Sequence, residues 1–163
     1  MPNSLLIKRK ISEFNKIISV SGDKSISIRW ILFASLGSGT SKAENLLISD
    51  DVQAAIDAVK KLGIKVIKKG KLHKVYGNGI DGFKYKKDLI INAQNSGTLG
   101  RLILGFLINA DNPIKLVGDQ SLSKRDFKRV SDPLSKFGAN LKLKNKKNLP
   151  LIIEGSNNFI PSL

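Results

Sequence analysis

Residues 22–29 of the chain read Gly22-Asp23-Lys24-Ser25-Ile26-Ser27-Ile28-Arg29, a turn that runs into an apolar segment ending at Leu36. Such a turn predicts a helix start, where free backbone N–H groups and the positive end of the helix dipole attract anions. Lys24 adds a positive charge, Ser25 can donate a hydroxyl, and Arg29 lies one turn further on the same face. Because an arginine inside an apolar helix is costly unless it is paired, the segment indicates an anion-binding helix start.

A purely structural explanation of the same segment stays open. Ser25 would cap the helix, and Arg29 would pair with a nearby acid such as Asp50 or Asp51. The glycine-rich spacing of a P-loop is missing, so this segment is not a nucleotide-binding P-loop.

The apolar helix occurs twice. The segments 25–36 and 97–108 are apolar nearly all round, and each carries an arginine, Arg29 or Arg101, four residues after a small residue near its start. A helix that is apolar on all faces is buried on most sides, and we expect this of both segments.

A second pair of segments also matches. Residues 52–69 and 127–144 each predict an amphipathic helix, a glycine cap and an alternating strand. Gly63 and Gly138 lie where a helix C-cap favours the left-handed conformation. Because helices and strands alternate along the chain, the sequence indicates the α/β class. The other strands expected are residues 17–20, 41–46, 74–76, 89–92, 113–117 and 149–154.

The repeated pattern gives the expected domain organisation. Two βαβαββ units are predicted at about residues 16–79 and 88–155, and residues 1–15 precede them. The tail, residues 156–163, is polar, contains Pro161 and has no closing element, which suggests truncation.

A second anion-suited helix start is expected at residues 92–101. A strand ends there, and a loop with Asn95 leads to Gly97, which permits a ligand to approach backbone N–H groups. Thr98 offers a short polar side chain, and Arg101 repeats the position of the first helix's arginine. An ordinary cap by Asn95 or the serine after it is the simpler alternative, but a cap does not explain a second inward arginine.

Residues 118–125 form a third loop of this kind. Arg125 lies at the N-terminus of a helix expected to start near Asp126, where the helix dipole disfavours a cation. A basic residue there is explained if an anion lies between it and the helix, and a solvated loop arginine is the alternative. We expect Arg129, one turn later, to lie on the surface.

The charge of the chain is strongly positive. Its 163 residues carry a formal net charge of +15, which a nucleic-acid partner, an acidic small substrate or a lysine-rich surface would each explain. Only five basic residues are arginines, and three of these fall in the motifs above. Because arginine is the better bidentate ligand of phosphate and carboxylate, we interpret the arginines as the binding signal and the lysines as surface background. Aromatic residues make up only 6% of the chain, which disfavours stacking on nucleic-acid bases.

Cysteine and histidine content limits the chemistry. There is no cysteine, and His73 is the single histidine, so disulfides, thiolate metal sites and multi-histidine metal sites are excluded. The lysines on either side of His73 indicate a solvated hairpin. No nucleophile–base or carboxylate pair stands out, so we assign no catalytic residue.

No apolar run is long enough to span a bilayer and no signal peptide is evident, so we expect a soluble, cytoplasmic protein.

Three motifs in register resemble a single family. Residues 23–29 together with 45–52 are similar to the opening of EPSP synthases (3-phosphoshikimate 1-carboxyvinyltransferases). Residues 95–101 resemble the second signature of that family, and residues 118–134 resemble the third. The order and spacing of these motifs agree with the family pattern over residues 20–154, nearly the whole chain.

The resemblance implies repeated βαβαββ units around buried helices, the inside-out α/β barrel of enolpyruvyl transferases. It also implies transfer of the enolpyruvyl group of phosphoenolpyruvate to the 5-hydroxyl of shikimate 3-phosphate, in the shikimate pathway to aromatic amino acids, with no metal or organic cofactor. By resemblance, Lys24 contacts both substrates, while Ser25 and Arg29 hold shikimate 3-phosphate. The residues implied at phosphoenolpyruvate are Gly97 and Arg125, with Asn95, Thr98 and Arg101 shaping the same pocket.

The sequence departs from the family pattern at several positions. Ser21 replaces a usual proline, and Ile28 stands where histidine or asparagine is common. The pair Asp126-Phe127 replaces a usual Pro-Met, so that Asp126 can pair with Arg125 and compete with a ligand for it.

The length of the chain is the largest departure. The family has three units in each of two domains, its first residues belong to the other domain, and that other domain supplies the acid and base residues. We therefore expect a fragment that supplies part of the substrate-binding half, is inactive alone and partners with the remainder of the enzyme. The alternatives are a basic nucleic-acid or RNA-end binding module on the same fold, and a non-catalytic partner of a separately encoded remainder.

Overall fold

The computed structural model describes Leu6, Lys8, Lys10 and residues 15–156. The first half contains α1 (Lys24–Leu36), β1 (Thr40–Glu44), α2 (Asp50–Lys61), β2 (Lys65–Lys69) and β3 (Leu72–Tyr76). The second half contains β4 (Leu89–Asn92), α3 (Gly97–Phe106), β5 (Ile114–Val117), α4 (Gln120–Ser123), α5 (Lys128–Lys136), β6 (Asn140–Lys144) and β7 (Asn148–Glu154). The first 14 residues and the tail beyond Ser156 lie largely outside the described part, and so do the predictions made for them.

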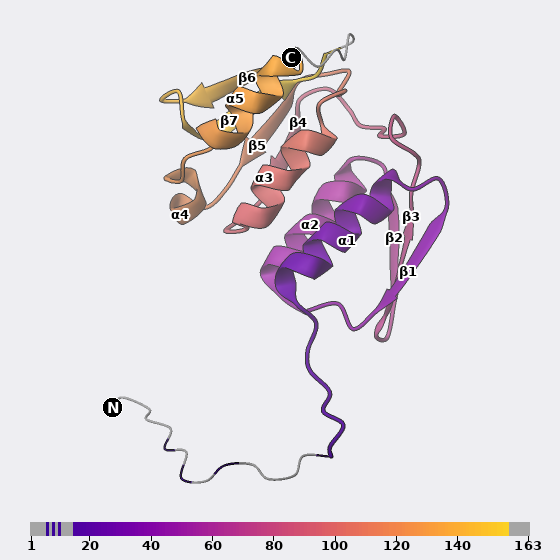
Figure 1. Ribbon diagram of the computed structural model, residues 1–163. Helices are drawn as coiled ribbons and strands as arrows, with labels where there is room; N and C mark the ends of the chain where they lie inside the picture. The colour runs from indigo at the N-terminus through magenta and orange to yellow at the C-terminus, as the bar shows by residue number, and fades with distance from the viewer. Residues whose placement is uncertain (1–5, 7, 9, 11–14, 157–163) are drawn as a thin grey trace.

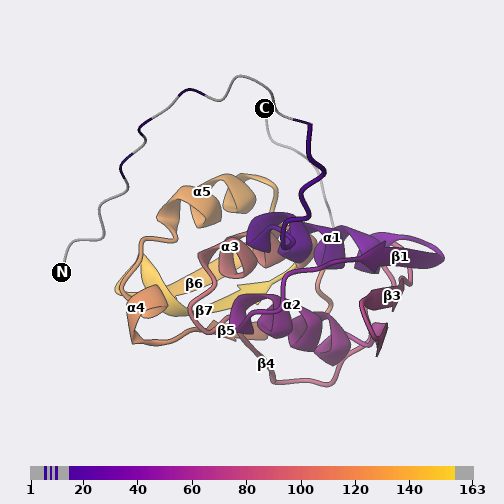
Figure 2. The ribbon, with the colours of Figure 1, turned by 90° about the horizontal axis from the view of Figure 1, so that it is seen from below.

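The strands form two separate sheets. The first has the order β1-β3-β2 and is antiparallel throughout. The second has the order β4-β5-β7-β6, in which only β4 and β5 run parallel. Helices α1, α2 and α3 lie between the two sheets (Figures 1 and 2). The predicted mixed α/β class is confirmed, whereas the inside-out barrel built from repeated units stays a prediction.

One hydrophobic core extends through both halves. Its buried side chains come from the helices, such as Ile28 and Leu99, and from alternate positions of the strands, such as Val75, Leu116 and Leu151. In β7, residues of one face are buried and those of the other are not, which is the alternation expected of a strand covered on one side. This common core fixes α1 and α3 relative to each other.

Two predicted elements differ from the structure. Residues 17–20 form no strand, since no described strand pairs with them, and Ile17 and Ile18 are exposed. The helix expected near Asp126 starts at Lys128, and the short α4 precedes it. Arg125 therefore lies in the link between α4 and α5 and not at a helix N-terminus.

Helix α1 is covered on only part of its apolar surface. Ile28, Ile31 and Leu32 are buried, but Ile26 and Phe33 are each 62% exposed. The ring of Phe33 meets Phe106 of α3 edge-on, with 5.2 Å between the ring centroids. The expectation of burial on most sides is thus wrong for the face of α1 that carries Ile26 and Phe33.

The start of α1 is held against the turn at residues 45–47. Asp23 caps the helix, since its side chain accepts from the Ile26 N–H at 2.7 Å. The Ser27 hydroxyl accepts from the Leu47 N–H at 3.0 Å and donates to the Asp23 carbonyl at 2.6 Å. Gly22 allows this approach, because a Cβ there would lie 2.1 Å from the Asn45 carbonyl oxygen.

His73 is buried, and the predicted solvated hairpin is wrong at this residue. It belongs to the hairpin β2–β3, but the alternation of β3 turns it and Val75 toward the helices, leaving His73 only 4% exposed. Burial lowers the pKa of His73 below its ordinary value of 6.5, the backbone of Lys71 opposes this shift, and the charge of Lys68 lowers the pKa further.

Substitution of Gly22 by alanine tests the contact between α1 and the 45–47 turn. We expect Gly22→Ala to destabilise the fold by about 2 kcal/mol, because the new methyl group overlaps backbone atoms that cannot move freely. Gly105→Ala is the matched control: it has open space around it inside α3 and should stabilise by up to about 1 kcal/mol. Urea unfolding of both variants measures the difference, and equal effects would contradict the contact.

The burial of His73 predicts a pH dependence of stability. Because its folded-state pKa is lowered, the unfolded chain binds more protons below pH 6.5, so the free energy of unfolding falls as the pH drops through this range. The slope from this residue reaches at most about 1.4 kcal/mol per pH unit. Urea unfolding between pH 7.5 and 5 should show this contribution to the pH dependence in the wild type, and the contribution should be absent in His73→Gln. An identical slope in both proteins would rule out the buried imidazole as its source.

Candidate functional site

The starts of α1 and α3 lie next to each other and border an open, shallow hollow of about 300 Å³. We call it the α1–α3 hollow, and it brings together five of the eight residues predicted as site residues. Its lining consists of Ser25, Arg29, Gly97, Thr98, Arg101 and Leu102.

The α1 side of the hollow differs from the structural alternative considered for it. The helix cap is Asp23 and not Ser25, and the carboxylate of Asp51 pairs with Lys24 at 2.9 Å and not with Arg29. Arg29 has no salt bridge among residues 15–156, and its Nε donates to the Ser25 carbonyl at 3.2 Å. Arg29 and Ser25 therefore remain available to a ligand, whereas Lys24 lies outside the lining and is engaged by Asp51.

The α3 side of the hollow is a capped helix start. Ser96 is the cap, as one alternative predicted, and its hydroxyl accepts from the Leu99 N–H at 3.3 Å. Gly97 is approached by two guanidinium groups: a Cβ on it would lie 2.9 Å from Nη1 of Arg125 and 3.4 Å from Nη1 of Arg101. The glycine thus leaves room for two arginines at a helix N-terminus.

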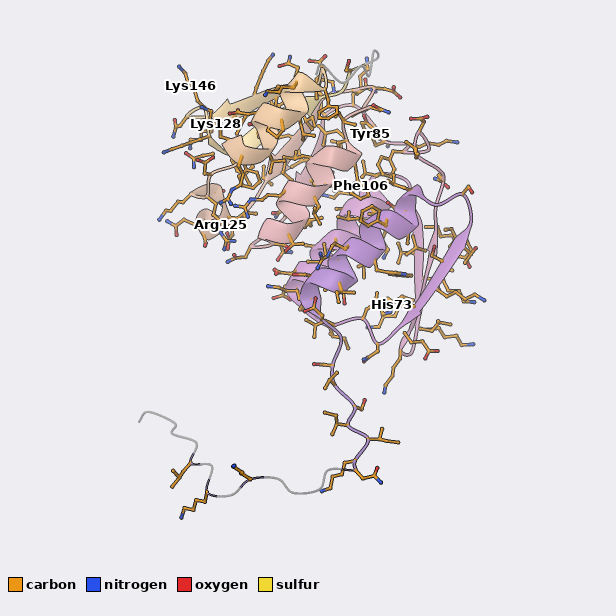
Figure 3. The ribbon with its side chains drawn as sticks, viewed as in Figure 1. His73, Tyr85, Phe106, Arg125, Lys128 and Lys146 are labelled. Atoms are coloured by element: carbon orange, nitrogen blue, oxygen red, sulfur yellow. The ribbon has the colours of Figure 1, made fainter. Side chains whose placement is uncertain are left out.

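Arg125 reaches this helix start from the link between α4 and α5 (Figure 3). Its Nη2 donates to the Asn95 side-chain oxygen at 3.0 Å, so Asn95 orients the guanidinium. The expected competition from Asp126 does not occur, because that carboxylate accepts from the Lys128 N–H at 2.6 Å. Within the described part of the chain, no salt bridge engages Arg125.

Arg101, Arg125 and Arg129 form what we call the arginine cluster. Burial lowers the pKa of Arg101, the charges of Arg129 and Arg125 lower it further, and Asp126 partly opposes them. The Nε of Arg101 is buried without a hydrogen-bond partner. Mutual repulsion among these guanidinium groups is a condition that a bound anion relieves. The sequence pattern led us to expect Arg129 on the surface, where it is, but did not indicate its effect on Arg101.

The chemistry available in the α1–α3 hollow is binding and electrostatic stabilisation. Its lining holds two arginines, two hydroxyls and a helix start, but no carboxylate or imidazole. Such a set can hold phosphate or carboxylate groups and stabilise developing negative charge. General acid or base catalysis would need groups from elsewhere.

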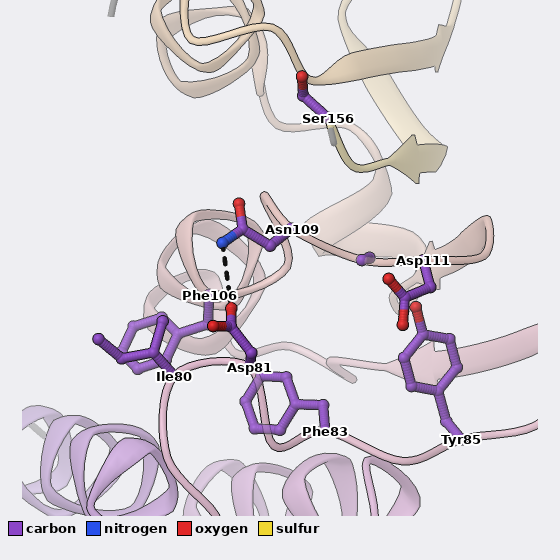
Figure 4. Close-up of a pocket in the computed structure, with 9 residues that line it drawn as sticks. Ile80, Asp81, Phe83, Tyr85, Phe106, Asn109, Asp111 and Ser156 are labelled. Carbon is purple, nitrogen blue, oxygen red and sulfur yellow. Dashed lines mark hydrogen bonds between the residues drawn. The ribbon is translucent and has the colours of Figure 1, made fainter. Parts of the chain in front are cut away.

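A second hollow of about 290 Å³ differs in character (Figure 4). The rings of Phe83, Tyr85 and Phe106 line it together with the carboxylates of Asp81 and Asp111. The carboxylates repel anions, so this hollow is not the anion site that the motifs predict.

Neither a membrane span nor a metal site is found within residues 15–156. No helix in this range is both long enough and apolar enough to cross a bilayer. No group of acidic and histidine side chains there is arranged to hold a metal ion.

Comparisons with known proteins point to one family. The sequence matches the family EPSP synthase (3-phosphoshikimate 1-carboxyvinyltransferase) over residues 8–159. The 3-phosphoshikimate 1-carboxyvinyltransferase of Sulfurihydrogenibium sp. (strain YO3AOP1) is 41% identical over 148 residues, which is 90% of this chain and 34% of that protein. That of Streptococcus suis (strain 98HAH33) is 38% identical over 156 residues, covering 95% and 36%.

Solved structures agree with the sequence matches. The EPSP synthase from Acinetobacter baumannii superposes with a TM-score of 0.79 at 32% identity, over 85% of this chain and 32% of that chain. The present chain thus spans about a third of the length of the relatives it matches.

Replacement of Arg125 tests whether the arginine cluster is a binding feature or a structural one. We expect Arg125→Gln to leave the free energy of unfolding unchanged or to raise it by up to about 0.5 kcal/mol at low salt, because it relieves repulsion on Arg101. The gain should vanish at about 0.5 M salt, where charges are screened. Lys42→Gln, an exposed residue of β1, is the control. A loss above about 1 kcal/mol would identify Arg125 as structural.

Proposed function

Because the chain belongs to the EPSP synthase family, we propose that it supplies part of the substrate site for transfer of the enolpyruvyl group from phosphoenolpyruvate to the 5-hydroxyl of shikimate 3-phosphate. The observation that carries the proposal is the α1–α3 hollow, where arginines from two helices meet beside a helix N-terminus. Both substrates carry a phosphate and a carboxylate, and such a set of donors suits them.

The two sides of the hollow take different substrates in this proposal. Ser25 and Arg29 on α1 hold the phosphate of shikimate 3-phosphate through a hydroxyl and a guanidinium. Gly97 and Arg125 hold phosphoenolpyruvate at the start of α3, and Arg101 contributes positive charge from the same helix. The support is the lining of the hollow by residues of two facing helices and the approach of Arg125 to Gly97 from the link between α4 and α5. Neither Arg29 nor Arg125 has a salt bridge among the described residues.

Lys24 has to leave its ion pair with Asp51 before it can contact a substrate. Its ammonium group pairs with Asp51 at 2.9 Å, and its side chain is 51% exposed. Solvent reaches the lysine end of the pair, although the Asp51 side chain is only 18% exposed, so a substrate phosphate can compete with the carboxylate for Lys24. In the proposal, Lys24 leaves Asp51 and contacts both substrates when they bind.

The domain arrangement is part of the proposal. Residues 16–79 and 88–155 are, in this proposal, two units of the βαβαββ type from an incomplete enolpyruvyl transferase domain, and the described part of the first unit has no leading strand. The strands β1-β3-β2 and β5-β7-β6 follow the same order in the two sheets. The α1–α3 hollow lacks an acid or base, so turnover depends on residues outside this chain. The remainder of the enzyme is the partner that would supply them. Release of phosphate by the chain alone would contradict this.

Titration of the full 163-residue chain with each substrate tests the site. We expect shikimate 3-phosphate to raise the unfolding midpoint of the wild type, and Arg29→Ala to lose at least about tenfold in affinity, because a charge-assisted contact to phosphate is removed. Arg125→Ala should lose a similar factor for phosphoenolpyruvate. Calorimetry or thermal shift at constant ionic strength gives both affinities.

Two controls distinguish specific binding at the α1–α3 hollow from non-specific attraction of anions to a positively charged chain. Lys142→Ala removes an exposed cation of β6, outside the lining of the hollow, and should leave both affinities unchanged. Inorganic sulfate at the same ionic strength measures non-specific stabilisation. Equal responses of Arg29→Ala and the wild type to shikimate 3-phosphate would remove Arg29 from the site.

A further inference from the structure

Phe127 lies in the core beside Arg101, one member of the arginine cluster. It is 0% exposed, and its backbone N–H donates to the Lys147 carbonyl in the turn between β6 and β7 at 2.8 Å. Its ring also packs against α3, since a Cβ on Gly100 would be in ordinary contact with ring atoms at 3.4 Å. The ring is therefore fixed both by the second sheet and by the helix that carries Arg101.

The guanidinium of Arg101 lies over this ring. Its central carbon is 5.6 Å from the ring centroid, within the range of a cation–π interaction. The other contacts of Arg101 are weak: Nη2 is 3.5 Å from the Asp126 carbonyl, and the buried Nε has no hydrogen-bond partner. Among the described residues, the face of Phe127 and the charge of Asp126 thus both attract Arg101.

Repulsion makes such a contact necessary. The charges of Arg125 and Arg129 both act on Arg101, and no described carboxylate forms a salt bridge with it. Arg125 has Asn95 to orient it, whereas Arg101 has no comparable side-chain acceptor among the described residues. The attraction of the guanidinium to the face of Phe127 and to the charge of Asp126 offsets this repulsion.

We propose that Phe127 is a positioning residue, whose ring holds the Arg101 guanidinium at the α1–α3 hollow so that an anion meets two arginines already in place. An aliphatic side chain could fill the same space in the core, but it lacks the negative ring face that attracts a cation. The inference rests on the proposed function in one respect, namely that Arg101 and Arg125 face the anionic groups of phosphoenolpyruvate.

A pair of substitutions in the full chain tests this role. Phe127→Leu removes the ring and keeps an apolar side chain, while 3,4,5-trifluorophenylalanine at position 127 keeps the ring shape and weakens its negative face. We expect Phe127→Leu to weaken phosphoenolpyruvate binding about fivefold to tenfold, and the fluorinated ring to weaken it about threefold. Phe83→Leu, at the other hollow, is the matched control and should leave affinity unchanged.

A double-mutant cycle separates positioning from general stability. If Phe127 acts through Arg101, Phe127→Leu has no further effect on affinity once Arg101→Gln is present. A purely structural role would give the same fold-loss in both backgrounds and would overturn the proposal.

A measurement without ligand keeps the test decisive if the chain binds too weakly to titrate. In NMR spectra of the wild type, the Arg101 Nε–H resonance should be ordered and shifted upfield by the ring, and Phe127→Leu should abolish both features. An Arg101 signal that is averaged in the wild type, or unchanged by Phe127→Leu, would refute the positioning role. If Arg125→Ala does not alter phosphoenolpyruvate binding, the proposed function is refuted instead. The NMR spectra then still decide whether Phe127 positions Arg101.

Discussion

The contact between the start of α1 and the turn at residues 45–47 sets the position of the whole candidate site. Gly22 lets the two backbones meet, and the Ser27 hydroxyl bonds to both of them. The contact determines the direction in which α1 leaves the turn, and therefore where Ser25 and Arg29 lie relative to α3. In this motif the serine expected to cap the helix lines the hollow instead, and the serine two residues later holds the backbone.

The candidate site combines groups that repel each other with groups that hold them in place. Arg101 and Arg125 approach the same glycine, and each is oriented by an uncharged neighbour, Phe127 or Asn95. Uncharged partners leave the positive charge intact for a ligand, whereas a carboxylate would neutralise it. The departure from the family pattern after Arg125 fits this arrangement, because Asp126 accepts from the first N–H of α5 and does not pair with the arginine.

Much of this could be predicted from the sequence, and the failures have physical causes. The apolar helices, the glycine caps and most strands follow from local periodicity and turn chemistry, and the left-handed conformations at Gly63 and Gly138 are confirmed. Which serine or aspartate caps a helix depends on atomic contacts, so the pattern indicates Ser25 whereas the cap is Asp23. The burial of His73 differs from the prediction because Lys74 faces the other side of β3 and Lys71 lies in the turn before the strand, so neither shows where the imidazole points. The role of Phe127 could not be predicted, because it depends on packing between β6, β7 and α3.

The uncovered face of α1 affects how the chain behaves in concentrated solution. Ile26 and Phe33 present apolar surface on a body with a net charge of +15. Charge repulsion keeps copies apart at low ionic strength, whereas added salt screens it and leaves the apolar faces free to associate. We therefore expect added salt to favour association of copies of this chain through this face of α1.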